Sequence, residues 1–155
     1  MYLETTIPSH LTAWRSPDLV MAARQQITRE WWDTRRFEFD LFISQLVIDE
    51  AGAGDASAAA LRLEVLKGIT LLEFGDDASA LSKLLVRELS LPSRAESDAI
   101  HIAMAVVNGI DYLLTWNCTH VANAALRPKI EQACRTFEYK MPVICTSEEL
   151  KAVLP

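Results

Sequence analysis

The chain has 155 residues, half of them hydrophobic and 23% charged, with a formal net charge of -6. This length and composition are typical of one soluble globular domain, so we expect a single domain over residues 1–155. No apolar run approaches the ~18 residues of a membrane span, and no secretory leader opens the chain. The negative charge argues against binding nucleic acid through a broad basic surface, but it does not exclude a nuclease whose metal site is itself acidic.

Three cysteines, Cys118, Cys134 and Cys145, are odd in number and widely spaced along the chain. They show no C-x-x-C pairing of the kind that binds a metal. We therefore expect free thiols and a reducing, cytoplasmic location.

Strands and helices are predicted to alternate along the whole sequence. In the first half, the expected elements are a strand at residues 2–4, a helix capped by Thr6, a helix at 19–35, a strand at 37–43, and helices at 44–51 and 56–66. In the second half, they are a strand at 69–74, a helix at 78–89, a helix at 92–107, a strand at 111–115, a helix at 124–137, a strand at 142–145 and a short helix from Thr146. This alternation predicts an α/β fold with a mainly parallel sheet and helices on both faces.

Asp98 is the most informative single residue, because it lies in a helix that is apolar on nearly every face. We expect this helix to be buried in the domain centre. An ionised carboxylate there needs a partner or a metal ion, since burying an unpaired charge costs several kcal/mol or forces protonation.

Three further polar residues lie near the ends of predicted strands: Glu4 closes the first, Glu50 lies in the helix after the second, and Asn117 follows the fourth by two residues. In a parallel α/β sheet, ligands bind beyond the carboxyl ends of the strands, where the strand order reverses. If the first and fourth strands are neighbours there, these side chains converge with Asp98. Carboxylate and amide oxygens suit Mg²⁺ or Mn²⁺, and no nucleophile elbow or phosphate-binding glycine loop is present. Metal-assisted hydrolysis of a phosphodiester is the chemistry that remains.

Each candidate also has an ordinary structural explanation. Glu4 could cap the following helix, and Asp49 could replace its neighbour as the ligand. Asp98 could pair with an arginine, and Asn117 could order its own turn. His101, one turn after Asp98 on the same helix face, is expected to be a core histidine.

Four segments in the same order resemble the motifs of PIN-domain nucleases. They are Tyr2-Leu-Glu-Thr-Thr6, Ser44-Gln-Leu-Val-Ile-Asp-Glu50, Asp98-Ala-Ile-His-Ile-Ala103 and Asp111-Tyr-Leu-Leu-Thr-Trp-Asn117. Because the segments span most of a chain of this length, it looks most like the single-domain VapC-type toxins of toxin–antitoxin pairs.

The resemblance implies a three-layer α/β/α domain with a five-stranded sheet of order 3-2-1-4-5. It also implies an Mg²⁺- or Mn²⁺-dependent endoribonuclease acting on single-stranded RNA, often a homodimer and often inhibited by a small antitoxin. Glu4, Glu50, Asp98 and Asn117 take the catalytic and metal-binding positions.

The chain departs from the family pattern at Glu4 and Asn117, where aspartate is usual or frequent, so weaker activity is expected. The candidate substrate contacts are Thr5, Thr6, His120 and Asn123, of which the last two could equally fix their loop. The alternative function is a weakly active or inactive PIN-like domain that binds a protein or RNA. The RNA target and the number of metal ions stay open.

Overall fold

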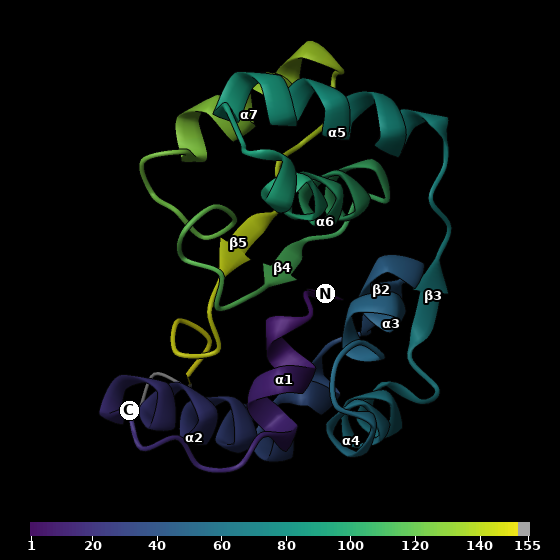
Figure 1. Ribbon diagram of the computed structural model, residues 1–155. Helices are drawn as coiled ribbons and strands as arrows, with labels where there is room; N and C mark the ends of the chain where they lie inside the picture. Colours follow the sequence, from purple (N-terminus) through teal and green to yellow (C-terminus); the bar gives the residue numbers. More distant parts are fainter. Residues whose placement is uncertain (152–155) are drawn as a thin grey trace.

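The computed structural model describes residues 1–151, in which five short strands form one parallel sheet (Figure 1). The strands are β1 (Tyr2–Leu3), β2 (Phe42–Ser44), β3 (Thr70–Leu72), β4 (Tyr112–Leu114) and β5 (Val143–Cys145). Their order is β3-β2-β1-β4-β5, and all four pairings are parallel. The predicted α/β/α fold with this strand order is confirmed.

The helices form two groups that sandwich the sheet, as Figure 1 shows. One group consists of α1 (Thr6–Thr12), α2 (Leu19–Thr34), α3 (Gln45–Ala51) and α4 (Ala56–Leu66). The other consists of α5 (Asp76–Leu89), α6 (Glu96–Val107) and α7 (Arg127–Thr136). The division follows from the strand order. The chain moves outward from β1 to β3 and then returns to β4 and β5, so right-handed crossovers place the two groups on opposite faces.

The centre of the sheet is where the candidate site must lie. Tyr2 of β1 pairs with Phe42 of β2 on one side, and Leu3 pairs with Leu114 of β4 on the other. Beyond β1, the backbone N–H of Glu4 donates to the Leu114 carbonyl over 3.0 Å. The direction of the connections reverses between β1 and β4, which is the place where open α/β sheets bind ligands.

The core is built around β1, β4 and α6. Leu3, Leu113 and Leu114 are fully buried in the sheet, and the residues of α6 from His101 to Val106 are buried as well. The prediction that this helix lies in the domain centre is confirmed. Burial of α6 on nearly every face explains why its few polar side chains need partners.

Three local predictions are wrong. The strand expected from residue 37 begins only at Phe42, because Arg36–Glu38 form a short 3-10 helix and Phe37 is 76% exposed. Thr6 is the first residue of α1 rather than its cap, and its hydroxyl turns back to Glu4. The C-terminal segment forms turns at residues 147–150 instead of a helix.

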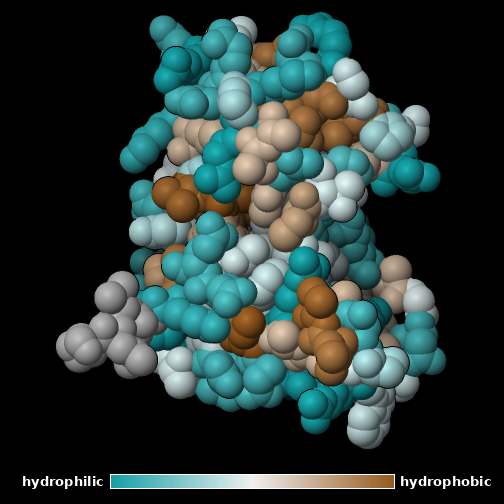
Figure 2. Space-filling model, turned by 90° about the vertical axis from the view of Figure 1, so that its left-hand side faces the viewer, coloured by the Kyte–Doolittle hydropathy of each residue, from teal (hydrophilic) through white to brown (hydrophobic). Residues whose placement is uncertain are grey.

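The surface is mixed in character. The face shown in Figure 2 is largely hydrophilic, with separate hydrophobic patches. Cys118 is exposed, whereas Cys134 and Cys145 are buried, and all three are free thiols. No helix within residues 1–151 has the length and apolarity that a membrane span requires.

Candidate active site

Glu4 follows β1 at the centre of the sheet, and the residue is buried, with 4% of its surface exposed. Its Oε2 accepts hydrogen bonds from the Thr6 backbone N–H over 3.1 Å, from the Thr6 hydroxyl, and from the Thr115 hydroxyl over 2.7 Å. No residue of the described chain donates to Oε1 in the same way. One oxygen of Glu4 is therefore fixed by three donors, and the other is free to bind a ligand.

Glu50 reaches the same place from α3. Its Oε2 accepts hydrogen bonds from the Thr5 hydroxyl and from Nε2 of His101, the latter over 3.0 Å. Burial acts to raise the pKa of Glu50, but hydrogen bonds from His101, Thr5 and Ser97 and the proximity of His101 outweigh it and lower the pKa below its usual value. Glu50 is consequently ionised at neutral pH.

Ligand atoms of Glu4, Glu50 and His101 all lie within 4.8 Å of one another. The two carboxylates are hard oxygen donors, which Mg²⁺ and Mn²⁺ prefer, and Mg²⁺ often needs only one or two protein carboxylates. The residues present therefore fit a divalent ion of this class. Asp49, the neighbour that could have replaced Glu50, is exposed and bonded to Gln45 on the outside of α3.

Asp98 belongs to a second cluster at the start of α6. Its Oδ1 accepts a hydrogen bond from Nδ2 of Asn117 over 2.9 Å, and its Oδ2 lies 2.7 Å from Nδ1 of His120. The backbone N–H of His120 donates to Oδ1 of Asn117 over 3.1 Å. Because a backbone N–H can only donate, this contact fixes the amide orientation, so Asn117 presents its NH₂ group to Asp98. Among the residues described, Asp98 has no arginine partner, and both its oxygens are engaged.

Thr115 connects the two clusters. This fully buried residue donates from its hydroxyl to Glu4 and accepts the backbone N–H of Asn117 over 2.9 Å. The candidate residues thus converge at the predicted edge of the sheet, but they do so as two adjacent groups. Asp98 is not part of the group within 4.8 Å.

The remaining candidates contact the protein itself. Thr5 and Thr6 direct their hydroxyls at Glu50 and Glu4, respectively. Asn123 donates to the Thr119 carbonyl over 2.7 Å and accepts the Ala125 N–H over 2.9 Å, so both ends of its amide order the loop.

Comparison with protein families gives one match, to the PIN domain, over residues 1–117 of the 155-residue chain. The chain belongs to the PIN-domain family. Comparisons with curated proteins and with solved structures give no match. PIN domains are in general metal-dependent nucleases, and the acidic group at the sheet edge agrees with that chemistry.

Sequence reasoning missed the residues that support the acidic side chains of this PIN domain. Tyr2, Ser44 and Thr115 lie in or beside apolar strands, where nothing marks their hydroxyls as functional. His101 was expected to be a core histidine, and it is 1% exposed, but it also contacts Glu50. Its position one turn after Asp98 was the one sequence feature that could have indicated a contact with the site.

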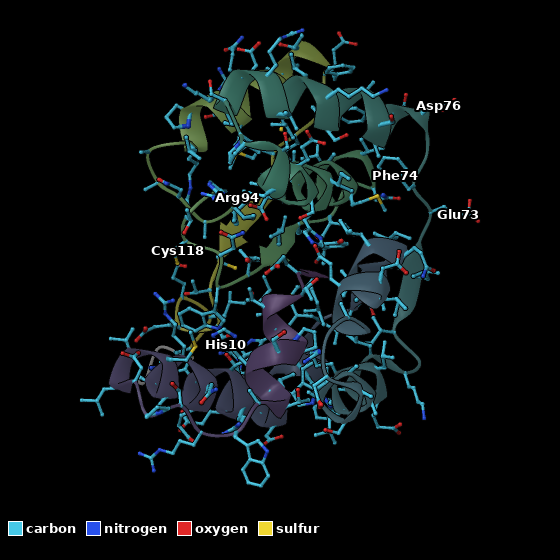
Figure 3. The ribbon with its side chains drawn as sticks, in the orientation of Figure 1. His10, Glu73, Phe74, Asp76, Arg94 and Cys118 are labelled. Carbon is cyan, nitrogen blue, oxygen red and sulfur yellow. The ribbon has the colours of Figure 1, made fainter. Side chains whose placement is uncertain are left out.

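Two exposed side chains, Cys118 and Arg94, lie near the site residues in sequence. Cys118 directly follows Asn117, and Arg94 precedes α6 by two residues. Figure 3 shows that Arg94 and Cys118 lie on the same side of the molecule, with Glu73, Phe74 and Asp76 on the opposite side. Arg94 is exposed and makes no ion pair with any residue described.

Proposed function

We propose that this PIN domain is an Mg²⁺- or Mn²⁺-dependent endoribonuclease that hydrolyses phosphodiester bonds in single-stranded RNA. The observation that carries the proposal is the convergence of Glu4 and Glu50, each with one oxygen held by donors of the protein. Two carboxylates oriented in this way are suited to binding one divalent cation.

In this proposal, Glu4, Glu50, Asp98 and Asn117 keep the acidic-site positions but have unequal roles. Glu4 and Glu50 hold the ion, which when bound supplies a Lewis acid for the phosphoryl oxygen and a water of lowered pKa. Asp98 adds negative charge beside the ion and is held in place by Asn117 and His120.

Thr5, Thr6 and Thr115 orient the two glutamates, so that little reorganisation is required when substrate binds. Arg94 contributes a cation for an RNA phosphate at the rim, where the net charge of the chain is otherwise unfavourable. Binding should accordingly weaken as the salt concentration rises.

We also propose that residues 1–155 form a single domain that acts in the cytoplasm as the toxin of a toxin–antitoxin pair, as a homodimer inhibited by a small antitoxin. The four ordered motifs resemble those of PIN-domain nucleases, and the length of the chain, with one expected domain, is most like that of the VapC-type toxins, which supports this role. A neighbouring gene for a small DNA-binding antitoxin, together with the mass of the purified protein in solution, tests it.

The alternative is a weakly active or inactive PIN-like domain that binds a protein or RNA. It is favoured by the engagement of both Asp98 oxygens and by the NH₂ group that Asn117 offers where many relatives have a carboxylate. The side chain of Glu4, which is longer than the usual aspartate, also favours this alternative. Thermal unfolding during an Mn²⁺ titration separates the two functions, because a site that binds metal is stabilised by mass action and an inactive one is not.

The decisive experiment compares two substitutions on the same helix. Glu50→Gln removes a charge from the site, whereas Asp49→Asn removes one from the exposed face of α3. We expect wild type and D49N to cleave single-stranded RNA in the presence of Mn²⁺, and we expect this cleavage to cease when a chelator removes the ion. E50Q should not cleave the RNA under either condition. Equal cleavage by E50Q and D49N would contradict the proposal.

A further inference from the structure

A line of buried hydrogen bonds leads from the core to Glu50. Ser44 Oγ lies 2.7 Å from the Tyr2 hydroxyl, which lies 2.9 Å from Nδ1 of His101. Nε2 of His101 lies 3.0 Å from Oε2 of Glu50. Four elements of the fold, β2, β1, α6 and α3, each contribute one side chain.

The polarity of this line follows from its two ends. Oε2 of Glu50 already accepts the Thr5 hydroxyl, and as a carboxylate oxygen it accepts from His101 as well, so Nε2 of His101 carries the proton. In a neutral imidazole Nδ1 is then an acceptor, so Tyr2 donates to it, and Ser44 donates to the Tyr2 oxygen.

This polarity leaves His101 without a nitrogen for a metal ion, although it belongs to the group within 4.8 Å. One ring nitrogen is committed to Glu50 and the other to Tyr2. Carboxylates that bind metals are commonly held by such hydrogen bonds, and the supporting groups affect metal affinity strongly.

The burial of the line indicates that it has more than a packing role. Tyr2 is fully buried, His101 is 1% exposed and Ser44 is 2% exposed. Three polar groups in a core are costly unless each is satisfied, and apolar residues would fill the same space without that cost. Here Ser44, Tyr2 and His101 satisfy one another, and the carboxylate of Glu50 at the site accepts the last donor of the line.

We propose that His101 is a positioning residue that orients Glu50, and that Tyr2 and Ser44 fix the imidazole in the tautomer protonated at Nε2. The inference rests on the proposed function, because Glu50 is oriented for the ion it holds. Thr5 bonds the same oxygen of Glu50, so both donors act together to direct the other oxygen toward the site.

Two substitutions at His101 distinguish positioning from packing. His101→Gln places an amide N–H near the position of Nε2 and retains the donor to Glu50, whereas His101→Asn places it near Nδ1 and loses that donor. Mn²⁺ affinity is measured by electron paramagnetic resonance of the free ion, and thermal unfolding without metal checks the fold of each variant.

We expect H101N to weaken Mn²⁺ binding about 10- to 100-fold, the range typical of groups that support a metal ligand. H101Q should stay close to wild type. Tyr2→Phe, which keeps the ring and removes only the hydroxyl, should give a smaller loss than H101N. Equal Mn²⁺ affinity for H101N and H101Q at similar thermal stability would overturn the proposal.

The tautomer provides a test that needs no metal. The nitrogen NMR spectrum of the imidazoles in wild type should show His101 protonated at Nε2 alone, and protonation at Nδ1 alone would overturn the proposal. If wild type neither bound Mn²⁺ nor cleaved RNA, the proposed function would fail, and this spectrum would still decide whether the hydrogen-bonded line exists as described.

Discussion

The two clusters at the sheet edge differ in how their carboxylates are held. Glu4 and Glu50 each have one oxygen saturated by hydroxyl, amide or imidazole donors. Asp98 has one donor on each oxygen, an amide on one and an imidazole on the other. A carboxylate with one oxygen free of donors can offer that oxygen to a cation alone, whereas a cation at Asp98 must share an oxygen with a hydrogen-bond donor, since each carboxylate oxygen has two lone pairs.

This difference indicates that the two clusters have different roles within one acidic site. The Glu4 and Glu50 side is organised before any ion arrives, and the Asp98 side is organised around neighbouring side chains. Thr115 holds the two sides together, because its hydroxyl donates to Glu4 and accepts the backbone N–H of Asn117. The two sides should therefore respond differently to substitution.

The largest expected difference concerns metal affinity. Glu4→Gln keeps an oxygen for the surrounding donors but removes the charge, and we expect it to weaken Mn²⁺ binding by more than about 100-fold, above the range for supporting groups. Asp98→Asn should weaken it by no more than about tenfold. Isothermal titration of each variant with Mn²⁺ measures both values. A larger loss of Mn²⁺ affinity in D98N than in E4Q would contradict the proposed difference between the two clusters.

A second prediction concerns Asn117 and the stability of the metal-free protein. Asn117→Asp replaces the NH₂ donor with a carboxylate that faces Asp98, so like charges meet and a hydrogen bond is lost. We expect a loss of about 1.5–3 kcal/mol in the free energy of unfolding, typical of hydrogen bonds to charged groups. Urea unfolding without metal measures it.

The same variant should regain stability when Mn²⁺ is added, and by more than wild type does, because the ion neutralises the new charge. A matched control is Asn123→Asp, in which the changed amide bonds the Thr119 carbonyl and the Ala125 N–H rather than Asp98. Equal responses of the two variants to Mn²⁺ would show that Asn117 does not belong to the site.

The smallest expected effect is a pH dependence that originates in Glu50. Its pKa in the folded protein lies below the usual 4.5, as hydrogen bonds from His101, Thr5 and Ser97 outweigh burial. A lowered pKa gives stability that is fully present above pH 4.5 and is lost as the pH falls through the folded-state value. The difference in unfolding free energy between wild type and E50Q should therefore shrink below pH 4.5. A difference that stays constant across that range would contradict the ionised, hydrogen-bonded state of Glu50.

The fold was predictable because it depends on local patterns that the sequence shows directly. Alternating strands and helices identified the α/β class, and the apolar run after Asp98 identified a central buried helix. Strand boundaries were less predictable. The start of β2 depends on the pairing of Phe42 with Tyr2 of β1, which the local sequence does not show, so Phe37 was wrongly assigned to a strand.

The site was predictable in its location and less so in its contacts. The convergence of Glu4 with Glu50 follows from the strand order, which the resemblance supplied. The orientation of the Asn117 amide depends on one backbone N–H in the following loop, and no sequence pattern reveals it. The contact of Tyr2 with His101 joins residues 99 positions apart, and it emerges only when β1 packs under α6.

The exposed thiol of Cys118 offers a practical way to observe this site. Burial raises the pKa of Cys134 to about 11 and that of Cys145 to about 12, so both remain protonated and unreactive at pH 8. A maleimide fluorophore or spin label should therefore attach selectively beside Asn117 in the unmodified sequence. Such a reporter would register ions or RNA arriving at the rim without any engineered cysteine.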